Sequence, residues 1–323
     1  MIAVVCPNPA IDRHAVVPGF EKGRVHRAES LRVLAGGKGL NVARILAELG
    51  HRPTVLGFAG GYAGRQLEEG VRTFGGAPRF TAVGAESRTC YTVVDPVSGT
   101  QTLINEQGMP VTTEEVERFW RAFVDEAARS RWVVLSGSLP PGAPVDLYTR
   151  MVTFCRQRCV NTVLDTSGAP LEAALQGAAA PTYLKTNRLE YSEAVGHCPN
   201  LPHDLWQAAS ASLRDSVAHI ITDGAARVGV VTKAGTWFLY PPKVEVVNAV
   251  GAGDAFTAGL VSELATGAPL EAAVRFAVAC SSIKVANLTP TLGVDAGRIR
   301  EIAAKVRIEA AQGAQGPPPA SWA

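Results

Sequence analysis

The sequence lacks the features that mark membrane, secreted or nucleic-acid-binding proteins. It has no stretch of about 18 uncharged apolar residues, so no transmembrane helix is expected. The N-terminal stretch MIAVVCPNPAID has no charged leader, and its apolar run is too short for a signal peptide. There is no basic tract and the formal net charge is only +2, which indicates neither nucleic acid nor an anionic membrane as a partner. We therefore expect a cytoplasmic protein.

Paired cysteines are also missing. The six cysteines of the 323-residue chain are scattered and none has CxxC spacing, so neither a disulfide framework nor a zinc site is indicated. Cys155 and Cys159 lie one helical turn apart, and we interpret them as packing residues rather than a metal pair.

Several common catalytic and nucleotide-binding motifs are absent as well. GGKGLN at 36–41 is not a P-loop, because Arg32 stands where that motif needs a glycine and no Ser or Thr follows Lys38. GAGDAF at 251–256 lacks the third glycine of the dinucleotide fingerprint and lies far from a first βαβ unit. Neither GxSxG nor HExxH occurs.

What the sequence does contain is a regular alternation of apolar runs and helical patterns. The apolar fraction of 47% and charged fraction of 19% indicate a sizeable core. The alternation is typical of a mostly parallel sheet covered by helices, so we expect a doubly wound α/β fold in one domain, 1–308. Strands are predicted at 2–5, 54–58, 132–136, 162–165, 182–185, 219–222 and 228–232, and helices at 40–49, 113–128, 145–156, 205–214, 254–264 and 270–285.

Two segments interrupt this alternation. Residues 15–33 are polar and mixed, while 88–105 read as two strands joined by a turn at 95–99. Together they predict a small sheet that serves as a lid, a dimer surface or both. The last segment, 309–323, is rich in Gly, Pro, Ala and Gln and is expected to be a disordered tail.

Polar residues follow most of the predicted strands. Ligands of open α/β sheets bind beyond the carboxyl ends of the strands, so a row of such residues indicates a ligand crevice, although each alone is more typical of a helix cap or turn. The row is Asn8, Asp12, Ser136, Ser138, Asp165, Lys185, Asn187, Thr222 and Asp223.

The stretch VNAVGAGDAFTAG at 247–259 places a carboxylate where a helix begins. A helix N-terminus presents unpaired N–H groups and attracts anions, and glycines let a phosphate approach the backbone. Asp254 is therefore either a helix cap or a catalytic group that works beside bound phosphate.

GGKGLNVARILAELG and NAVGAGDAFTAG resemble the two signature regions of the PfkB-type (ribokinase-like) carbohydrate kinases. NPAID, LSGSLPPG and LKTNRLE match further motifs of that family in the expected order, and the resemblance covers about 2–302. It implies a three-layer α/β/α fold with a small β lid and an ATP- and Mg²⁺-dependent transfer of the γ-phosphoryl group to a sugar hydroxyl. Within the family the chain is most similar to the phosphosugar branch, which includes 1-phosphofructokinases and tagatose-6-phosphate kinases.

The resemblance also implies roles for individual residues. Asp254 would be the general base, and the backbone N–H groups of Ala252, Gly253 and Asp254, beside Gly251, would form the anion hole. Thr222, Gly224 and Lys185 would contact the nucleotide. Arg227 or Val228 stands where the family's nucleotide loop has glycine, which leaves the path of that loop open.

Asn187 and Glu190 would organise Mg²⁺ through water, with a solvated helix face as the alternative for Glu190. For the sugar, Asp12 would hold hydroxyls, Gly36 and Gly37 would permit close approach, and Asn41 would add an amide. The residues implied around the substrate's existing phosphate are Lys38, Arg88 and Ser138.

Two cations beside the substrate favour a phosphosugar over a free sugar. Fructose 1-phosphate is the first expectation, because its kinase is the more widespread activity of this branch, and tagatose 6-phosphate is the alternative. A nonenzymatic sugar-phosphate sensor on the same fold is a different-class alternative. The resemblance also implies a homodimer formed through the β lid.

Overall fold

The main body is built on one long sheet. The computed structural model describes residues 1–196, 202–287 and 289–311, and within them the sheet has ten strands. Their order is β14 (Arg307–Ala310), β13 (Gly235–Tyr240), β12 (Arg227–Thr232), β11 (Ala218–Asp223), β10 (Tyr183–Asn187), β9 (Asn161–Asp165), β8 (Trp132–Ser136), β1 (Ile2–Val5), β4 (Thr54–Ala59) and β5 (Ala77–Ala82). Strands β11 to β5 in this order pair in parallel, and β12, β13 and β14 form an antiparallel edge.

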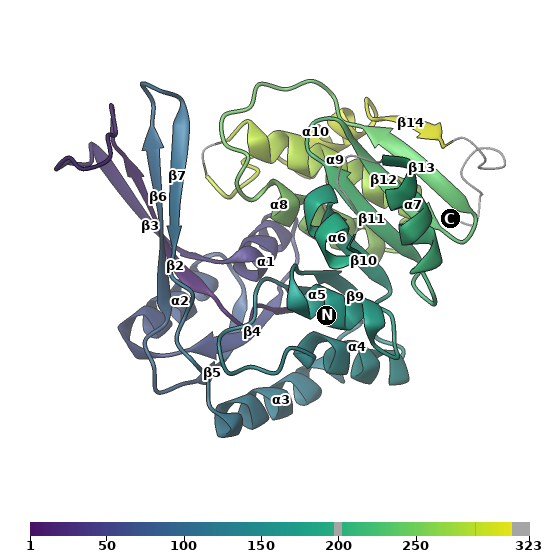
Figure 1. Cartoon of the computed structure of the whole chain (residues 1–323), viewed down its shortest axis with the longest axis horizontal. Coiled ribbons are helices and arrows are strands. Elements are labelled where there is room, and N and C mark those ends of the chain that lie inside the picture. Colours follow the sequence, from purple (N-terminus) through teal and green to yellow (C-terminus); the bar gives the residue numbers. More distant parts are fainter. Residues whose placement is uncertain (197–201, 288, 312–323) are drawn as a thin grey trace.

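Helices cover both faces of this sheet (Figure 1). Successive side chains of a strand point to opposite faces, and in β1 Ile2 and Val4 join one buried cluster while Ala3 and Val5 join the other. The first cluster contains buried side chains of the helices on one face, namely α1 (Lys38–Glu48), α2 (Gly61–Thr73), α8 (Ala252–Ala265), α9 (Leu270–Val285) and α10 (Ala296–Ala303). The second cluster contains buried side chains of the helices on the other face, namely α3 (Thr113–Ala127), α4 (Leu147–Gln157), α5 (Ala169–Gln176), α6 (Arg188–Ala194) and α7 (Pro202–Ala211). The predicted three-layer α/β/α architecture is confirmed.

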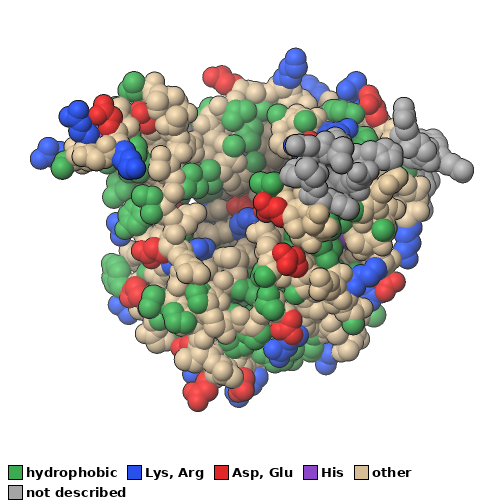
Figure 2. Space-filling view, in the orientation of Figure 1, with side chains coloured by type: hydrophobic (Ala, Val, Ile, Leu, Met, Phe, Trp, Pro, Cys, Tyr) green, Lys and Arg blue, Asp and Glu red, His purple; other side chains and the backbone are tan. Residues whose placement is uncertain are grey.

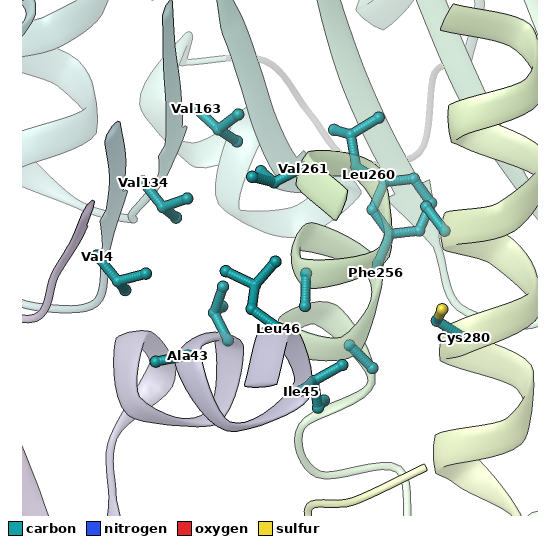
Figure 3. Close-up of a cluster of buried hydrophobic side chains, with 14 of the residues drawn as sticks. Val4, Ala43, Ile45, Leu46, Val134, Val163, Phe256, Leu260, Val261 and Cys280 are labelled. Atoms are coloured by element: carbon teal, nitrogen blue, oxygen red, sulfur yellow. The ribbon is translucent and has the colours of Figure 1, made fainter. Parts of the chain in front are cut away.

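Helix α8 is buried along most of its length. It packs between α1, α9 and the sheet, and Figure 3 shows Phe256, Leu260 and Val261 of α8 in one cluster with Leu46 of α1 and Val163 of β9. Each fully buried Leu or Phe contributes about 1.5–3 kcal/mol. The packing therefore fixes the N-terminal end of α8, which carries Asp254, relative to α1 and the strands.

A second sheet stands off the main body as the lid (Figure 1). Its strand order is β3 (Ser30–Gly36), β2 (Ala10–Val16), β6 (Arg88–Asp95) and β7 (Thr100–Asn105). The hairpin predicted at 88–105 is present, and the Asp95 carboxylate shapes its turn by accepting hydrogen bonds from Val97 N and Ser98 Oγ.

The first lid segment differs from the predicted 15–33. Strand β2 begins at Ala10 and β3 continues to Gly36, because the seven residues of each strand pair in full register. The predicted range was centred on 17–29, which is the polar connection between the two strands. It therefore included only the end of β2 and the beginning of β3. Consequently Asp12 lies on the lid rather than on the main sheet.

Several elements have no counterpart among the predictions, namely α2, α5, α6, α10, β5, β13 and β14. Strand β14 reaches residue 310, so the sheet continues past the expected domain end at 308. The tail prediction falls mainly on 312–323, which lie outside the described residues, and it stays a prediction. Among the helices in the described part of the chain, none is both long and apolar enough to cross a bilayer.

Candidate active site

A cavity of about 660 Å³ lies between the lid and the carboxyl ends of the central strands. Figure 2 shows the molecule hollowed between the lid and the main body, with charged side chains in the hollow. Most of the predicted site residues line this cavity: Asp12, Gly37, Lys38, Asn41, Arg88, Lys185, Asn187, Glu190, Thr222, Gly224, Gly251, Gly253 and Asp254. Segments far apart in the sequence are thus brought to one place, as the row of strand-end residues indicated.

Asp254 lies in the first turn of α8, 5% exposed. It is not the helix cap, because Gly251, with φ of 83°, occupies that position and no side chain caps the helix. Its Oδ2 instead accepts a hydrogen bond of 2.9 Å from Asn41 Nδ2. Burial and the nearby charge of Asp165 raise the pKa of Asp254 to about 6, against the opposing effects of Asn41, Lys38 and Lys185. A carboxylate with a pKa near neutrality is suited to accept a proton.

The N-terminus of α8 differs in one respect from the expected anion hole. The N–H of Ala252 donates to Ala249 O at 3.2 Å, so this amide is occupied within the turn. The amides of Gly253 and Asp254 belong to the first helical turn, where the helix supplies no acceptor. A Cβ atom on Gly253 would lie 2.7 Å from Lys185 Nζ, so the glycine leaves room for the ammonium beside the helix end.

Asp165 connects the cationic side chains of the site. It ends β9, is fully buried, and accepts hydrogen bonds from Lys185 Nζ (3.1 Å) and Thr257 Oγ1 (2.9 Å). Lys38 Nζ lies 3.6 Å from its other oxygen. Burial alone would raise the pKa of Asp165, but Lys185 and Lys38 hold it below the ordinary value. The sequence placed Asp165 among the strand-end polar residues without giving it a role in the site.

Lys38 lies closer to the residues predicted for the nucleotide than expected. Its ammonium forms an ion pair of 3.1 Å with Glu190, and Asp165 and Glu190 raise its pKa. Arg88 is anchored elsewhere, since its guanidinium donates to the backbone oxygens of Asn8 (2.8 and 3.1 Å) and Glu106 (3.0 Å). The two cations expected around one phosphate therefore have separate sets of partners.

Two residues predicted for the substrate site, Ser138 and Gly36, do not line the cavity. Ser138 is exposed, accepts a hydrogen bond of 3.3 Å from Asn8 Nδ2, and is not among the residues that line the cavity. Gly36 is also absent from the lining, because the side chain of Asp12 packs over it. A Cβ atom on Gly36 would lie 1.9 Å from Asp12 Oδ2, so this glycine makes space for the aspartate rather than for a ligand.

Asp12 faces the cavity from β2 of the lid. Burial raises its pKa to about 6, and the charges of Arg44 and Arg88 oppose the rise. Arg44, 8% exposed, donates to Asn41 Oδ1 at 3.1 Å and to the backbone oxygen of Ala35. Sequence reasoning missed Arg44, although its position three residues after Asn41 on one helix places both on the same face.

Asn187 and Glu190 form a capping box at the start of α6. Asn187 Oδ1 accepts from Glu190 N at 2.8 Å, and Glu190 Oε2 accepts from Asn187 N at 2.9 Å. With its other oxygen on Lys38, Glu190 is not part of a merely solvated face. In the described ranges no group of three His, Cys, Asp or Glu side chains is close enough to hold a metal alone. Mg²⁺ usually binds one or two carboxylates, waters and substrate phosphates, so Glu190 fits an ion held largely by a nucleotide.

Thr222 and Gly224 stand at the end of β11, where the chain turns sharply into β12. Gly224 has φ of 53°, and Asp223 pairs with Arg227 across this tight hairpin. The Arg227 guanidinium stacks on Phe238, 4.4 Å from the ring centroid, so it leaves the turn. The path of this loop, which the sequence left open, is a hairpin turn.

A second cavity of about 410 Å³ was not predicted. It lies between α9, α10 and the segments that flank them, and its lining includes Val244, Ile283, Ala286, Asn287, Leu292 and Val294. No motif marks it, because its walls come from separate segments and combine apolar residues with the polar side chains of Ser282, Asn287, Thr289, Thr291 and Arg298.

Comparisons with known proteins identify the family of this chain. The model of the pfkB family carbohydrate kinases matches residues 3–295. The chain is 32% identical over 291 residues to the 1-phosphofructokinase of Escherichia coli K12, covering 88% of this chain and 91% of that protein. It is similar to a Thermotoga maritima structure described as a possible 1-phosphofructokinase (TM-score 0.89, 26% identity, 97% and 100% of the two chains). It is also similar to Escherichia coli phosphofructokinase-2 in complex with fructose-6-phosphate (0.83, 25%, 94% and 98%). The family resemblance seen in the sequence is confirmed.

Proposed function

Because the chain belongs to the pfkB family of carbohydrate kinases, we propose that it uses ATP to phosphorylate fructose 1-phosphate, giving fructose 1,6-bisphosphate. The observation that carries the proposal is Asp254, a buried carboxylate with a pKa of about 6 at the N-terminus of α8, in the wall of a cavity that the lid partly covers. The 1-phosphofructokinase relative at 32% identity favours fructose 1-phosphate over tagatose 6-phosphate.

The reaction requires a hydroxyl oxygen of the sugar to attack the γ-phosphorus while the bond to ADP breaks. Asp254 accepts the proton that this hydroxyl loses, and Asn41 holds the carboxylate in place. The amides of Gly253 and Asp254, with Gly251 beside them, face the charge that develops on the transferring group. Lys38 and Lys185, both held by Asp165, add two positive charges nearby.

The phosphosugar occupies the half of the cavity next to the lid. Asp12 accepts hydrogen bonds from its hydroxyls, and Arg88 binds its existing phosphate with the guanidinium N–H groups that remain available beside the carbonyls of Asn8 and Glu106. His14 and Asn105 line the same half and supply further polar groups from the lid.

ATP occupies the other half, at the ends of β10 and β11. Lys185, Thr222 and Gly224 lie beside its phosphates and ribose, and Glu190 with Asn187 organises Mg²⁺ through water. When bound, the ion neutralises phosphate charge and polarises the group that is transferred. The apolar part of the second cavity, which includes Ile283 and Ala286, suits the flat adenine ring, and polar side chains such as Asn287 line the rest. Since ATP is a cytoplasmic metabolite, we expect the reaction in the cytoplasm.

The lid serves two purposes in this proposal. Its inner face closes over the sugar and excludes water from the phosphoryl donor. Its outer face is apolar: Val33 and Tyr91 both pair with Arg13, and Ile104 pairs with Tyr91, so these side chains share one face. Leu31, Val33, Tyr91 and Ile104 are 54%, 43%, 43% and 58% exposed. A homodimer formed through this face would bury them.

A coupled assay of ATP consumption tests the substrate. Fructose 1-phosphate, fructose 6-phosphate, tagatose 6-phosphate, free fructose and free tagatose are compared by kcat/KM. The proposal expects fructose 1-phosphate to be preferred. A preference for tagatose 6-phosphate would replace the substrate and keep the mechanism, whereas binding of a phosphosugar without any turnover would identify a sensor.

A further inference from the structure

Lys284 of α9 carries a charge into the interior. The residue is 1% exposed, and its ammonium donates hydrogen bonds of 3.2 Å to the backbone oxygens of Asn248 and Asn287. Among the ion pairs of the described residues none involves Lys284, although the charge of Asp254 raises the pKa of the lysine. An ammonium held by backbone carbonyls is an unusual occupant of a helix whose other buried residues are almost all apolar.

The carbonyl of Asn248 belongs to the turn that leads into α8. The N–H of Asn248 donates to Val285 O at 2.9 Å, and Asn248 Oδ1 accepts from Val250 N at 2.9 Å. A Cβ atom on Gly251 would lie 3.4 Å from Cε of Lys284. The lysine therefore packs directly behind the turn 248–251, whose far end carries the first amides of α8.

Burying the ammonium of Lys284 lowers the stability of the fold, which points to a role for the charge other than stabilisation. Moving an ammonium out of water is expensive, and carbonyl oxygens repay only part of the cost. Burial lowers the pKa of Lys284 to about 8, while the charge of Asp254 opposes that fall, so the group is still mainly protonated at pH 7. An apolar side chain of similar length would fill the same space without desolvating a charge.

We propose that Lys284 is a built-in cation of the catalytic machinery, a positioning residue whose ammonium holds the turn 248–251 in place and adds positive charge behind the N-terminus of α8. The inference rests on the proposed kinase function of that helix end. The lysine is not among the residues that line the cavity, so it acts through the turn and its electrostatic field. A further consequence is that the wild-type protein needs no exogenous monovalent cation at this position.

Two substitutions separate charge from packing. Lys284→Met keeps the volume and removes the charge, and Lys284→Ala leaves a polar cavity lined by the carbonyls of Asn248 and Asn287. Lys305→Ala, an exposed lysine after α10, is the matched control. We expect both Lys284 variants to lose about 10- to 100-fold in kcat, less than the loss of a direct donor, with the KM of the phosphosugar changed by less than about threefold.

Chemical rescue gives the decisive readout. Ammonium or potassium, compared with choline at equal ionic strength, should restore kcat of Lys284→Ala by at least about fivefold, but neither Lys284→Met nor the wild type should respond. The same salts should raise the Tm of Lys284→Ala alone, which can be measured even if the protein turns over no sugar. Wild-type kcat that rises with ammonium or potassium would overturn the proposal, as would Lys284→Met with normal kcat or Lys284→Ala without rescue in both kcat and Tm. If Lys284→Ala does not fold, the proposal is tested by the kcat of Lys284→Met and by the response of the wild type to ammonium and potassium.

Discussion

The side-chain amide of Asn41 donates a hydrogen bond of 2.9 Å to the carboxylate of Asp254 and so joins α1 to α8 in the wall of the cavity. The orientation of this amide is fixed, because Arg44, which has only donors, occupies its oxygen. Two motifs separated by more than 200 residues in the sequence are thereby connected through one hydrogen bond. The position and the ionisation of the proposed base both depend on this contact.

Replacing the base should separate activity from stability. Asp254→Asn keeps the size of the side chain and an oxygen that accepts from Asn41, so the fold is retained. Loss of the base should lower kcat by about 10²- to 10⁴-fold. Steady-state kinetics at pH 7.5 with circular dichroism as a check on folding measures this, and near-normal kcat would contradict the assignment.

The same substitution should stabilise the protein. The pKa of Asp254 in the folded state, about 6, lies above its ordinary value of 3.8, so the folded state binds the proton more tightly. Between pH 4 and 6 the contribution of this group to stability therefore falls as pH rises, and above pH 6 the full cost remains. Asp254→Asn should raise the free energy of unfolding at pH 7 by about 1–3 kcal/mol, and the gain should shrink toward pH 4. Denaturant melts at both pH values provide the test, and a variant less stable at pH 7 would refute the expectation.

Removing the Asn41 amide should move the pH dependence of the reaction. The base works when ionised, so kcat/KM should fall as pH drops through about 6. The hydrogen bond from Asn41 lowers the pKa of Asp254, and its loss in Asn41→Ala should move this acid limb upward by about one pH unit. An unchanged limb in a folded variant would show that the contact does not tune the base.

Much of this arrangement follows from local sequence. The central strands are continuous apolar runs and the helices have clear periodic patterns, so β1, β8, α3 and α9 lie within about a residue of their predicted bounds. The elements that were missed or misplaced have weaker signals. Strand β2 mixes an aspartate, an arginine and a histidine with apolar residues, and its pairing with β6 depends on a contact between distant segments.

Many of the residues that line the cavity could be predicted, but their partners could not. Glycines and a carboxylate at a helix start indicate a phosphate site from the local sequence alone. In contrast, the ion pair of Lys38 with Glu190 joins α1 to α6 across 152 positions, and only the three-dimensional structure brings them together. The buried charges of Asp165 and Lys284 likewise show their surroundings only after folding.

Gly36 offers a test of the space beneath Asp12. An added Cβ in Gly36→Ala would overlap the carboxylate of Asp12, so the aspartate must leave its present position. We expect the KM of the phosphosugar to rise by about tenfold or more while the KM of ATP changes little. Gly84→Ala is the control, because nothing lies within 4 Å of its Cβ position. Equal kinetics of the two variants would show that Asp12 is not held for the sugar.

Arg88 and Lys38, two of the cationic side chains of the cavity, should have different kinetic effects. Arg88→Ala should raise the KM of the phosphosugar by about one to two decades, since a charge-assisted contact is worth about 1.5–3 kcal/mol, and should leave the KM of ATP nearly unchanged. Lys38, paired with Glu190 and Asp165, belongs to the nucleotide half, so Lys38→Ala should lower kcat and raise the KM of ATP. Kinetics with each substrate varied in turn distinguish them, and identical patterns in both variants would refute the division.

The lid prediction concerns assembly and closure together. Its outer face exposes Leu31, Tyr91 and Ile104, and an aspartate at Ile104 would place a charge in the centre of the proposed dimer contact. Sedimentation at micromolar concentration should show a dimer for the wild type and a monomer for Ile104→Asp. Val97→Asp, on the exposed turn of the same hairpin, should remain dimeric as a control.

Closure is measured separately by hydrogen exchange. Strand β7 is exposed along most of its length, and elements with few buried contacts open most readily. Binding of the phosphosugar should therefore slow exchange in β6 and β7, whose inner face includes Arg88 and Asn105. Arg88→Ala should abolish the slowing, because the lid then loses its contact with the substrate phosphate. A wild-type protein that sediments only as a monomer would contradict the predicted dimer. Hydrogen exchange in β6 and β7 that is unchanged by the phosphosugar would contradict closure, so each half of the prediction has its own test.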